Sequence, residues 1–377
     1  MKKALLMAPM GSVHRRFNQA NIDALLSLGY EVHLLANFED GDGPEQQNQE
    51  YAKVEEGRGI TVHSIPYVRH SLIRNLKYIS ATKKLFKNEK FNLIHTHTET
   101  GAVLLRLSGK KKSNYFYTSH GFSFYKGCPF KARLIYKPIE KYLCHGMDIN
   151  IAINSEDFSV QNNWNKVKSR FVHGIGLNLN RFNSAENEIN TIRKEFGIPN
   201  DSKIVLSIGE LDDNKNHKTV IEAISFIKDI DIYYIICGVG PNKERLLQTA
   251  KKCGVESKVI FAGYRKDIPD VIFSSDLFVF PSFHEGLPVA LMEAMASGLP
   301  IVASNIRGVN DLIQDGVNGY LAKSESAQDF ASKLEMLLNN PSRASVFANK
   351  SKEIVERYSY SKVYEELKML YSEIEGI

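Results

Sequence analysis

The chain has 377 residues, of which 43% are hydrophobic and 24% are charged. This length predicts two domains, and this composition excludes a disordered chain, a collagen-like fibre and a small disulfide-stabilised protein. The formal net charge is +5, but residues 1–175 contain 25 basic and 15 acidic side chains, so the first half is basic and the second is mildly acidic. A partner with phosphates or anionic lipid headgroups would therefore meet the first half.

The N-terminal sequence MKKALLMAPMG has an apolar run of only six residues, and Arg15 and Arg16 follow soon after it. A signal peptide needs a longer apolar core, so this segment is interpreted as a first β-strand. No apolar run reaches the roughly 20 residues that a membrane span needs. The four cysteines form no C-x-x-C pair and are expected to be buried thiols, as in a reducing compartment. These features predict a cytoplasmic protein.

Short apolar runs alternate with amphipathic segments of helical length along the first half. Strands are expected at 4–9, 31–37, 60–67, 93–98, 115–120 and 149–154, and helices at 15–28, 70–88, 99–108, 130–143 and 155–164. This alternation predicts a parallel sheet with helices on both faces. The polar segment 37–50 is interpreted as a surface loop.

The same pattern restarts after residue 200. Strands are expected at 203–209, 232–238, 259–263, 276–282 and 300–304, and helices near 216–228, 241–253, 287–297 and 325–338. The Gly- and Asn-rich segment 173–188 separates the two patterns. We therefore expect domains at 1–175 and 176–355, with a charged helix at 356–377 that packs on the second domain or crosses back to the first. Parallel sheets bind ligands at the carboxyl ends of their strands, so the site is expected in a cleft between the domains.

The most informative segment is PSFHEGLPVALMEAMASGLPIVAS at 281–304. A strand, a short loop with Glu285 and Gly286, and a helix that begins near Leu287 follow one another. The unpaired N–H groups at the helix N-terminus suit an anion such as a diphosphate, and Gly286 leaves room for a ligand near the backbone. Glu285 and Glu293 are interpreted as acceptors for sugar hydroxyls, the alternative being a helix cap and an interior polar residue. For Glu293 that alternative is weak, because a carboxylate without a partner is costly in an apolar helix.

The segment E-G-L-P-V-A-L-M-E resembles the E-x7-E signature of the retaining, family-4-type glycosyltransferases with the GT-B fold. Three more segments are similar to the bacterial capsule and exopolysaccharide members of that family: T-S-H-G-F-x-F-x-K-G-x-P at 118–129, H-G-I-G-L-N at 173–178 and G-E-L-x-x-N-K-N-H at 209–217. The resemblance covers essentially the whole chain. It implies an α/β architecture of two Rossmann-like domains with parallel sheets facing a deep cleft. It further implies a nucleotide-sugar donor, taken to be UDP-linked, in the second domain and an acceptor in the first.

The resemblance implies roles for the residues around the E-x7-E signature. Glu285 should contact hydroxyls of the donor sugar, and Glu293 should contact the ribose. The backbone of Leu287, Pro288 and Val289 should meet the diphosphate. Pro288 has no N–H group, so it can only shape this turn.

Lys215 lies in GELDDNKNH, just after the strand at 203–209, and is the expected catalytic cation. Its ammonium would neutralise the leaving diphosphate, and stabilisation of developing charge is usually the largest contribution to catalysis. The chain departs from the family at Glu210, where many members have arginine. Glu210 is therefore expected to bind a sugar hydroxyl or to position Lys215, and Arg265 or Arg16 would replace the absent cation.

Other donor-site residues are expected at the ends of further strands. Gly11 follows the first strand and would let a phosphate lie close to the backbone. Gly238 ends its strand near the donor. Tyr264 and Arg265 follow the next strand, where the family holds the base, and Tyr264 either stacks on that base or packs internally.

Histidines are expected to contribute from the first domain. His120 resembles the family histidine near the donor sugar, where its side chain would bind a hydroxyl or its carbonyl would stabilise charge on the anomeric carbon. His95 and His97 alternate along one strand and share a face, and without a third ligand they are interpreted as a polar wall. The D-x-D pairs at 40/42 and 229/231 are interpreted as turn residues. No metal ion or other cofactor is therefore expected to be required.

Basic and apolar side chains are interleaved in segment 71–90. The lysines at 110–112 add to the basic charge of the first half, as do Lys126, Lys131, Arg133, Lys137 and Lys141. One interpretation is amphipathic helices that pack on a sheet with solvated faces. The other is a first domain that docks on an anionic membrane, at its cytoplasmic face, to reach a lipid-linked saccharide acceptor. Nucleic acid is not expected as a partner, because no recognition helix or stacking platform accompanies the charge.

The favoured function is a retaining, metal-independent hexosyl- or N-acetylhexosaminyltransferase for surface polysaccharide synthesis. It would move a sugar from a UDP-sugar to a lipid-linked glycan, with Lys215, Glu285 and His120 as its catalytic residues. One alternative is a nucleotide-sugar epimerase or hydrolase of the same fold, which product analysis would distinguish. The other is a non-catalytic accessory subunit, against which the presence of Lys215, Glu285 and Glu293 argues.

Overall fold

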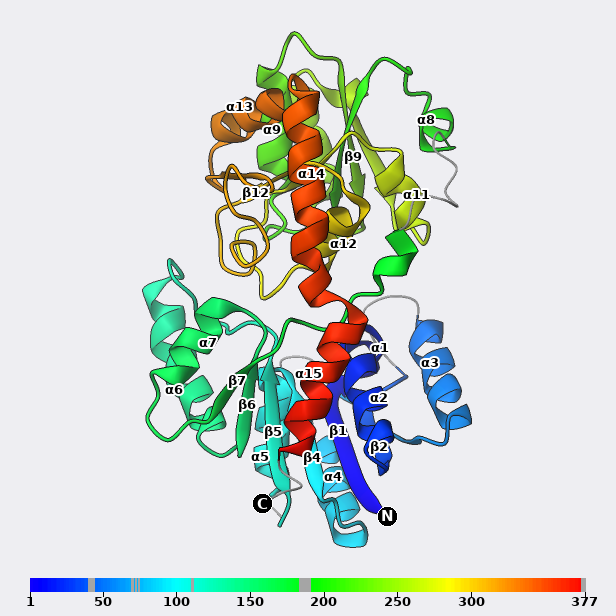
Figure 1. Ribbon diagram of the computed structural model, residues 1–377, viewed down its shortest axis with the longest axis vertical. Coiled ribbons are helices and arrows are strands. Elements are labelled where there is room, and N and C mark those ends of the chain that lie inside the picture. The colour runs from blue at the N-terminus through cyan, green and yellow to red at the C-terminus, as the bar shows by residue number, and fades with distance from the viewer. Residues whose placement is uncertain are drawn as a thin grey trace. The chain divides into compact units, whose positions relative to one another are not determined.

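The computed structural model describes residues 1–39, 45–68, 71, 73, 75–109, 112–182 and 191–373. The chain divides into two units (Figure 1). Unit 1 comprises Met1–Gly176 and Tyr360–Ile377, and unit 2 comprises Leu177–Ser359. Residues 183–188 of the expected boundary segment lie outside the described residues.

Unit 1 is built on a seven-stranded parallel sheet in the order β3-β2-β1-β4-β5-β6-β7. Its strands are β1 Lys2–Met10, β2 Tyr30–Asn37, β3 Thr61–Ser64, β4 Leu93–His97, β5 Asn114–Ser119, β6 Ile149–Ala152 and β7 Ser169–Phe171. Ala4 of β1 pairs with Val32 of β2 on one side and with Leu93 of β4 on the other. Helices cover both faces, which explains why the central strands are nearly continuous apolar runs.

The helices of unit 1 are α1 Gly11–Phe17, α2 Gln19–Ser27, α3 Glu45–Gly57, α4 Leu76–Asn88, α5 Thr98–Ser108, α6 Phe130–Cys144, α7 Ser155–Asn162 and α15 Tyr360–Ser372. Two sequence expectations were wrong here. The helix expected at 15–28 is two helices that meet at Asn18, and the loop expected at 37–50 gives way to α3 at Glu45. The polar composition of α3 hid this helix, because few apolar residues mark its inner face.

The C-terminal helix α15 packs on α2 within unit 1. Val363, Leu367 and Leu370 are buried in the same hydrophobic core as the α2 residues. In the middle of α15, both carboxylate oxygens of Glu366 bind His173: one accepts the backbone N–H at 2.9 Å, and the other lies 2.6 Å from Nδ1. Helix α15 therefore returns to the N-terminal sheet of unit 1 rather than to unit 2.

Unit 2 has a six-stranded parallel sheet in the order β10-β9-β8-β11-β12-β13. Its strands are β8 Lys203–Ile208, β9 Ile232–Cys237, β10 Val259–Gly263, β11 Leu277–Phe280, β12 Ile301–Ser304 and β13 Tyr320–Ala322. Its α-helices are α8 Thr191–Phe196, α9 His217–Phe226, α10 Lys243–Lys252, α11 Ile268–Phe273, α12 Val289–Ser297, α13 Ala327–Leu338 and α14 Pro341–Val355. The sequence missed β7 of unit 1 and α8, α11 and β13 of unit 2, which at three to six residues are too short to show periodicity.

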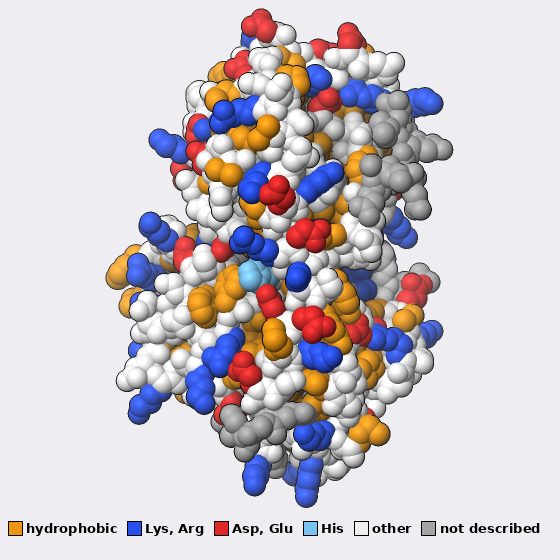
Figure 2. Space-filling model, in the orientation of Figure 1, with side chains coloured by type: hydrophobic (Ala, Val, Ile, Leu, Met, Phe, Trp, Pro, Cys, Tyr) orange, Lys and Arg blue, Asp and Glu red, His pale blue; other side chains and the backbone are white. Residues whose placement is uncertain are grey.

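Each sheet reverses its strand order once, between β1 and β4 in unit 1 and between β8 and β11 in unit 2. The loops after two such strands diverge to opposite faces, so the carboxyl edge at the reversal is the usual place for a ligand in a parallel sheet. On the face drawn in Figure 2, basic side chains are frequent over unit 1, in agreement with its composition. Among the helices of the described residues, none has the length and apolarity to cross a bilayer.

Candidate functional site

Two loops of unit 2 are held together at the strand-order reversal. The loop after β8 contributes Asn214, whose Nδ2 donates to the carbonyl of His284 at 3.1 Å and whose Oδ1 accepts the N–H of His284 at 3.1 Å. Asn216, which has a left-handed φ of 51°, donates from Nδ2 to the carbonyl oxygens of Pro281 and Ser324. These amide side chains tie the loop after β8 to the loop after β11, and asparagine tolerates the left-handed backbone that this requires.

Lys215 and Glu285 meet where these loops join. Lys215 Nζ lies 2.6 Å from Glu285 Oε1, and the side chains are 24% and 14% exposed. The lysine stem crosses Gly209, where an added Cβ would lie 3.2 Å from Lys215 Cγ and Cδ, and Nζ is 5.6 Å from the centre of the Phe280 ring. The two residues that the sequence singled out separately thus form one ion pair, in which Glu285 neutralises the lysine.

A second cation, Arg307, lies against the same loop and was not predicted from the sequence. It follows β12 and is only 8% exposed, and its Nε donates to the carbonyl oxygen of Glu285 at 3.0 Å. The loops touch there, because a Cβ on Gly308 would lie 2.3 Å from the carbonyl oxygen of Gly286. The only sequence signal for Arg307 was its place just after an expected strand.

Helix α12 begins at Val289 rather than near Leu287, so the expected start was two residues too early. Pro288 is the N-cap residue, and a residue before proline is disfavoured in helical conformation, which keeps Leu287 out of the helix. The N-cap makes no side-chain hydrogen bond and the first turn contains no acidic residue. The first N–H groups of α12 have no intrahelical acceptor, and no side-chain cap satisfies them at Pro288. The side chains of Leu287 and Val289 pack on the core of unit 2.

Glu293 lies in the second turn of α12, beside the short 3₁₀-helix η1 (Leu179–Phe182). Burial raises the pKa of its carboxyl to about 7, and Arg181 opposes that rise. Its helix neighbours Met292 and Ala294 are fully buried. No hydrogen-bond partner of its carboxylate occurs among the described residues. A partly buried carboxylate without a partner is costly, so its presence favours a ligand that supplies hydroxyl groups.

The other residues expected at the donor lie on neighbouring strand ends. Glu210 follows β8 and is exposed. Gly238 follows β9, and a Cβ there would lie 1.8 Å from the carbonyl oxygen of Gly209, so close backbone packing alone requires glycine. Tyr264 follows β10 and is 52% exposed, which disfavours internal packing and leaves its ring open to a flat ligand.

Arg265 is already neutralised within unit 2. Its Nη1 lies 2.6 Å from Glu195 Oε1, and its Nη2 and Nε bind the two carboxylate oxygens of Asp267 at 2.5 and 2.9 Å. These two carboxylates raise the pKa of the guanidinium further. The geometry therefore offers Arg307, not Arg265, as the second cation beside Glu285. Arg16, the other suggested substitute, is an exposed residue of α1 in unit 1.

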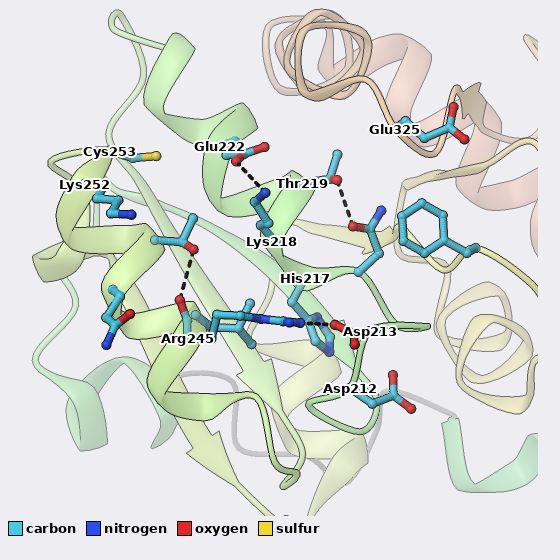
Figure 3. Close-up of a pocket in the computed structure, with 15 residues that line it drawn as sticks. Asp212, Asp213, His217, Lys218, Thr219, Glu222, Arg245, Lys252, Cys253 and Glu325 are labelled. Atoms are coloured by element: carbon cyan, nitrogen blue, oxygen red, sulfur yellow. Dashed lines mark hydrogen bonds and ion pairs between the residues drawn. The ribbon is translucent and has the colours of Figure 1, made fainter.

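A separate pocket of about 760 Å³ lies beside the loop after β8 (Figure 3). Its walls come mainly from α9 and α10, and neither Lys215 nor Glu285 lines it. Two of its basic side chains are paired: Arg245 binds Asp213, and Lys218 Nζ lies 3.5 Å from Glu222 Oε1. Lys252 also lines it, together with the carboxylates of Asp212 and Glu325. Neither the contact between Lys215 and Glu285 nor the N-terminus of α12 contributes to it, so this pocket is not the candidate donor site.

In unit 1, histidines gather at the carboxyl ends of the central strands. His97 Nδ1 lies 3.2 Å from His120 Nε2, and the rings of His95 and His97 are 4.2 Å apart on one face, as their alternation predicted. His95 also bridges Tyr371 of α15 and Thr118 of β5, at 2.7 and 2.8 Å. Burial lowers the pKa of His120 to about 4 and that of His95 to about 3. These imidazoles are therefore uncharged near neutral pH.

The remaining expectations in the sequence have structural explanations. Gly11 is the first residue of α1, and a Cβ there would lie 2.6 Å from the ring of Phe38. Asp231 binds Ser202 and Lys258 in the turn before β9, in keeping with its interpretation as a turn residue. The D-x-D pair at 40/42 lies outside the described residues. Within the described part of the chain, no group of three His, Cys, Asp or Glu side chains is placed to hold a metal ion.

Comparisons with known proteins agree with this architecture. The family model "Glycosyl transferase 4-like" matches residues 3–154, and "Glycosyl transferases group 1" matches residues 188–354. Among solved structures, HepE of Anabaena in complex with UDP and glucose has a TM-score of 0.80 at 18% identity, covering 99% of this chain and 100% of that one. The fold is thus that of a GT-B glycosyltransferase with two parallel-sheet Rossmann-like domains, which confirms the predicted fold class.

Two curated relatives identify the family of this chain more closely. The putative glycosyltransferase EpsD of Bacillus subtilis strain 168 is 30% identical, over 98% of this chain and 96% of the relative. The Escherichia coli UDP-Gal:alpha-D-GlcNAc-diphosphoundecaprenol alpha-1,3-galactosyltransferase is 27% identical over 80% of both chains. This chain belongs to the family-4-type glycosyltransferases, with exopolysaccharide-type homologues, as its motifs predicted.

Proposed function

We propose that this chain is a retaining glycosyltransferase that moves a sugar from a UDP-sugar to a lipid-linked saccharide in surface polysaccharide synthesis. The observation on which the proposal rests is the contact between Lys215 and Glu285 at the strand-order reversal of unit 2. A cation, a carboxylate and the N-terminus of α12 occur together there. This combination suits a ligand with both a diphosphate and sugar hydroxyls.

The ion pair prepares both groups for the donor. A diphosphate that binds Lys215 takes the place of Glu285 and frees its carboxylate to accept hydrogen bonds from sugar hydroxyls. Arg307 adds a second positive charge from the neighbouring loop, where its Nε donates to the Glu285 carbonyl. Glu293 provides a partly buried carboxylate for further hydroxyls, such as those of a ribose. The UDP in the HepE complex and the UDP-Gal in the name of the E. coli relative support uridine as the nucleoside of the donor.

In the transfer, the bond between the anomeric carbon and the UDP oxygen breaks ahead of the new bond. The electron pair leaves with the diphosphate, whose added charge Lys215 and Arg307 stabilise. The acceptor hydroxyl attacks from the same face and gives its proton to the departing diphosphate oxygen, so that the configuration is retained. In this scheme, side-chain cations and the N–H groups of α12 stabilise the leaving group, and we propose that no metal ion is required.

Unit 1 suits the acceptor. The polar groups at the carboxyl edge of its sheet are neutral imidazoles, and buried neutral donors and acceptors bind uncharged hydroxyl groups rather than phosphates. Among these imidazoles His120, which the motif at 118–129 identifies, is the one proposed to act on the transferred sugar, by a hydrogen bond to a hydroxyl or through its carbonyl oxygen. The diphosphoundecaprenol in the name of the E. coli relative supports a lipid-linked acceptor. The basic charge of unit 1 supports a peripheral enzyme at the cytoplasmic face of the membrane.

The first test is thermal stabilisation. A ligand that binds only the folded state raises the melting temperature, so UDP and its sugar should do so at micromolar to millimolar concentration, and ADP and GDP should not. A panel of UDP-sugars is then incubated with a lipid-linked saccharide, with and without a chelator. We expect a glycosylated lipid and an α-linked product from an α-linked donor in both conditions. Free sugar or an epimerised donor as the sole product would instead identify a hydrolase or an epimerase.

A further inference from the structure

Helix α6 of unit 1 exposes an unusual amount of apolar surface. Of its fifteen residues, six are large apolar side chains at least 37% exposed: Phe130, Leu134, Ile135, Tyr136, Ile139 and Tyr142. Phe130 reaches 77% and Leu134 reaches 63%. The described residues contain twenty-one such side chains in all, so this one helix accounts for more than a quarter of them. Contiguous patches of this kind on a protein surface usually mark a binding surface.

The charges on the exposed side of α6 are all positive. Lys131, Arg133 and Lys141 are exposed and Lys137 is half-buried, and none of them has an ion-pair partner among the described residues. The one acidic residue of the helix, Glu140, is buried, and it accepts a hydrogen bond from the hydroxyl of Tyr117 at 3.0 Å. The outer side of the helix therefore combines apolar groups with unpaired cations and no anion.

Helical spacing brings the apolar and basic groups to the same side. Phe130, Leu134 and Lys141 are separated by four and seven residues, so they lie along one side of the helix. Lys131, Ile135 and Tyr142 have the same spacing one residue further along the chain, so they lie along the neighbouring side. Figure 2 shows apolar and basic side chains next to one another where α6 lies, at the left edge of the view. An ordinary surface helix instead separates a buried apolar face from a charged exposed one.

The end of α6 is fixed by Arg106 of α5. Its Nη2 donates to the carbonyl oxygens of Tyr142 and Leu143 at 2.9 and 2.8 Å, and its guanidinium lies 4.8 Å from the centre of the Tyr142 ring. Leu143 and Cys144 are buried beneath. The helix is thus anchored on its inner side while its outer side is left uncovered.

Helix α4 provides a contrast within the same unit. From its sequence, segment 71–90, which contains α4, is interpreted either as a membrane-docking element or as a solvated amphipathic helix. In the structure Tyr78, Ile79 and Phe86 of α4 are buried in the core and its lysines are exposed, while Leu76, at the first residue of the helix, is a large apolar side chain that is exposed. Apart from that end, this is the arrangement of a solvated amphipathic helix, so the basic charge of α4 is accompanied by much less apolar surface than that of α6.

We propose that the outer face of α6 docks on the surface of an anionic phospholipid bilayer. Phe130, Leu134 and Ile135 would enter the boundary between headgroups and acyl chains, and the surrounding lysines and Arg133 would bind lipid phosphates. The charge complementarity selects this occupant, because such a bilayer presents a negative layer directly above an apolar one. The inference rests on the proposed function for its purpose, which is access to a lipid-linked acceptor.

The test is sedimentation of the protein with vesicles of phosphatidylcholine alone or with about 30% phosphatidylglycerol. The wild type should bind the anionic vesicles at least tenfold more strongly, and salt should weaken that binding. Substitution of Phe130, Leu134 and Ile135 together by serine should reduce the binding on the order of tenfold or more. The matched control, Lys83→Gln with Lys84→Gln in α4, removes two positive charges from the same unit and should change the binding by less than about threefold.

Two measurements keep the result interpretable. The serine variant must show the wild-type rise in melting temperature with UDP, which demonstrates an intact fold and an intact donor site. A wild type that does not bind anionic vesicles, or a serine variant that still binds them, would overturn the role of α6, while the UDP result would leave the proposed function standing.

Self-association of the wild type that disappears in the serine variant, without vesicle binding, would assign the outer face of α6 to a second copy of the chain and would overturn the membrane proposal. Conversely, vesicle binding without any UDP effect would count against the proposed function and not against α6.

Discussion

Units 1 and 2 share one architecture and differ in the charge of the side chains at the carboxyl edge. Both have a parallel sheet whose strand order reverses at the centre. In unit 2 the groups there are ionic, as in the contact between Lys215 and Glu285. In unit 1 they are buried imidazoles, and burial keeps the pKa of His120 near 4 and that of His95 near 3.

Because of this difference, the same architecture is suited to a different kind of ligand in each unit. A charged ligand needs countercharges at the strand ends, and a saccharide needs neutral groups that donate and accept hydrogen bonds. On this physical ground unit 2 suits the nucleotide diphosphate and unit 1 suits sugar hydroxyls. The comparison predicts that substitutions in unit 2 act on leaving-group chemistry and those in unit 1 on the handling of sugar.

The largest effect is expected for Lys215→Ala. Loss of the ammonium removes stabilisation of the charge that develops on the diphosphate, so kcat should fall about 10²- to 10³-fold. The KM for the UDP-sugar should change by only about threefold, because the uridine and the sugar retain their contacts. Steady-state measurement of UDP release gives both constants.

The matched control for that experiment is Lys218→Ala. Lys218 is three residues away and 58% exposed, and it approaches only Glu222 on the same helix. Its loss should leave kcat within about twofold of the wild type. If Lys215→Ala raised KM and left kcat unchanged, the lysine would bind the ground state and the proposed role in the transition state would be wrong.

Glu293→Gln tests the second carboxylate of unit 2 through stability. Burial raises the pKa of Glu293 from 4.5 to about 7, so the folded chain holds a proton that the unfolded chain releases between these values. The stability of the wild type relative to the glutamine variant should therefore be highest below pH 4.5 and fall as the pH rises to 7. The difference in the free energy of unfolding should change by up to about 3 kcal/mol over this range.

Thermal melts of both proteins at several pH values measure this difference. The control is Glu353→Gln in α14, whose side chain is 66% exposed. A constant difference between wild type and Glu293→Gln from pH 4.5 to 7.5 would contradict the burial argument. Added UDP should then stabilise the wild type more than the variant at pH 7.5 if the ionised carboxylate accepts hydrogen bonds from the ribose.

Much of the fold followed from the sequence because buried parallel strands are apolar runs. The strand expected at 259–263 has those bounds in β10, and the one at 203–209 exceeds β8 by a single residue. Helix ends were less predictable. The start of α12 moved to Val289 because of a proline, and α3 lacked the apolar periodicity that marks a helix.

The candidate site was predictable in its residues and not in its contacts. Motifs identified Lys215 and Glu285, but no local pattern could show that side chains 70 residues apart form a pair. Arg307 was missed for the same reason, since its role depends on a strand neighbour and not on its own sequence. Similarly, the bonds of Arg265 to Glu195 and Asp267 arise from tertiary packing.

A smaller loss of activity is expected for His120→Ala in unit 1. It removes a hydrogen bond to a sugar or to a group that becomes charged in the transition state, which corresponds to about 10- to 100-fold in kcat. The rise in melting temperature with UDP should be unchanged, because the residues proposed to bind UDP all belong to unit 2. His145→Ala, an exposed histidine of the same unit, is the control and should keep full activity in a detergent assay. If UDP no longer raised the melting temperature of the His120→Ala variant, the proposed division, with UDP in unit 2 and sugar hydroxyls in unit 1, would be wrong.

The smallest effect is expected for Arg265→Met, and its comparison with Arg307→Met sharpens the assignment of the second cation. Arg265 is neutralised by two carboxylates, so its removal should change kcat by less than about threefold. Arg307 donates to the carbonyl of Glu285 from a buried position, and its removal should lower kcat about tenfold and displace the loop that holds the carboxylate. Kinetics of UDP release for both variants in parallel decide between them. A larger loss in Arg265→Met would mean that donor binding breaks its two ion pairs and recruits that guanidinium to the diphosphate.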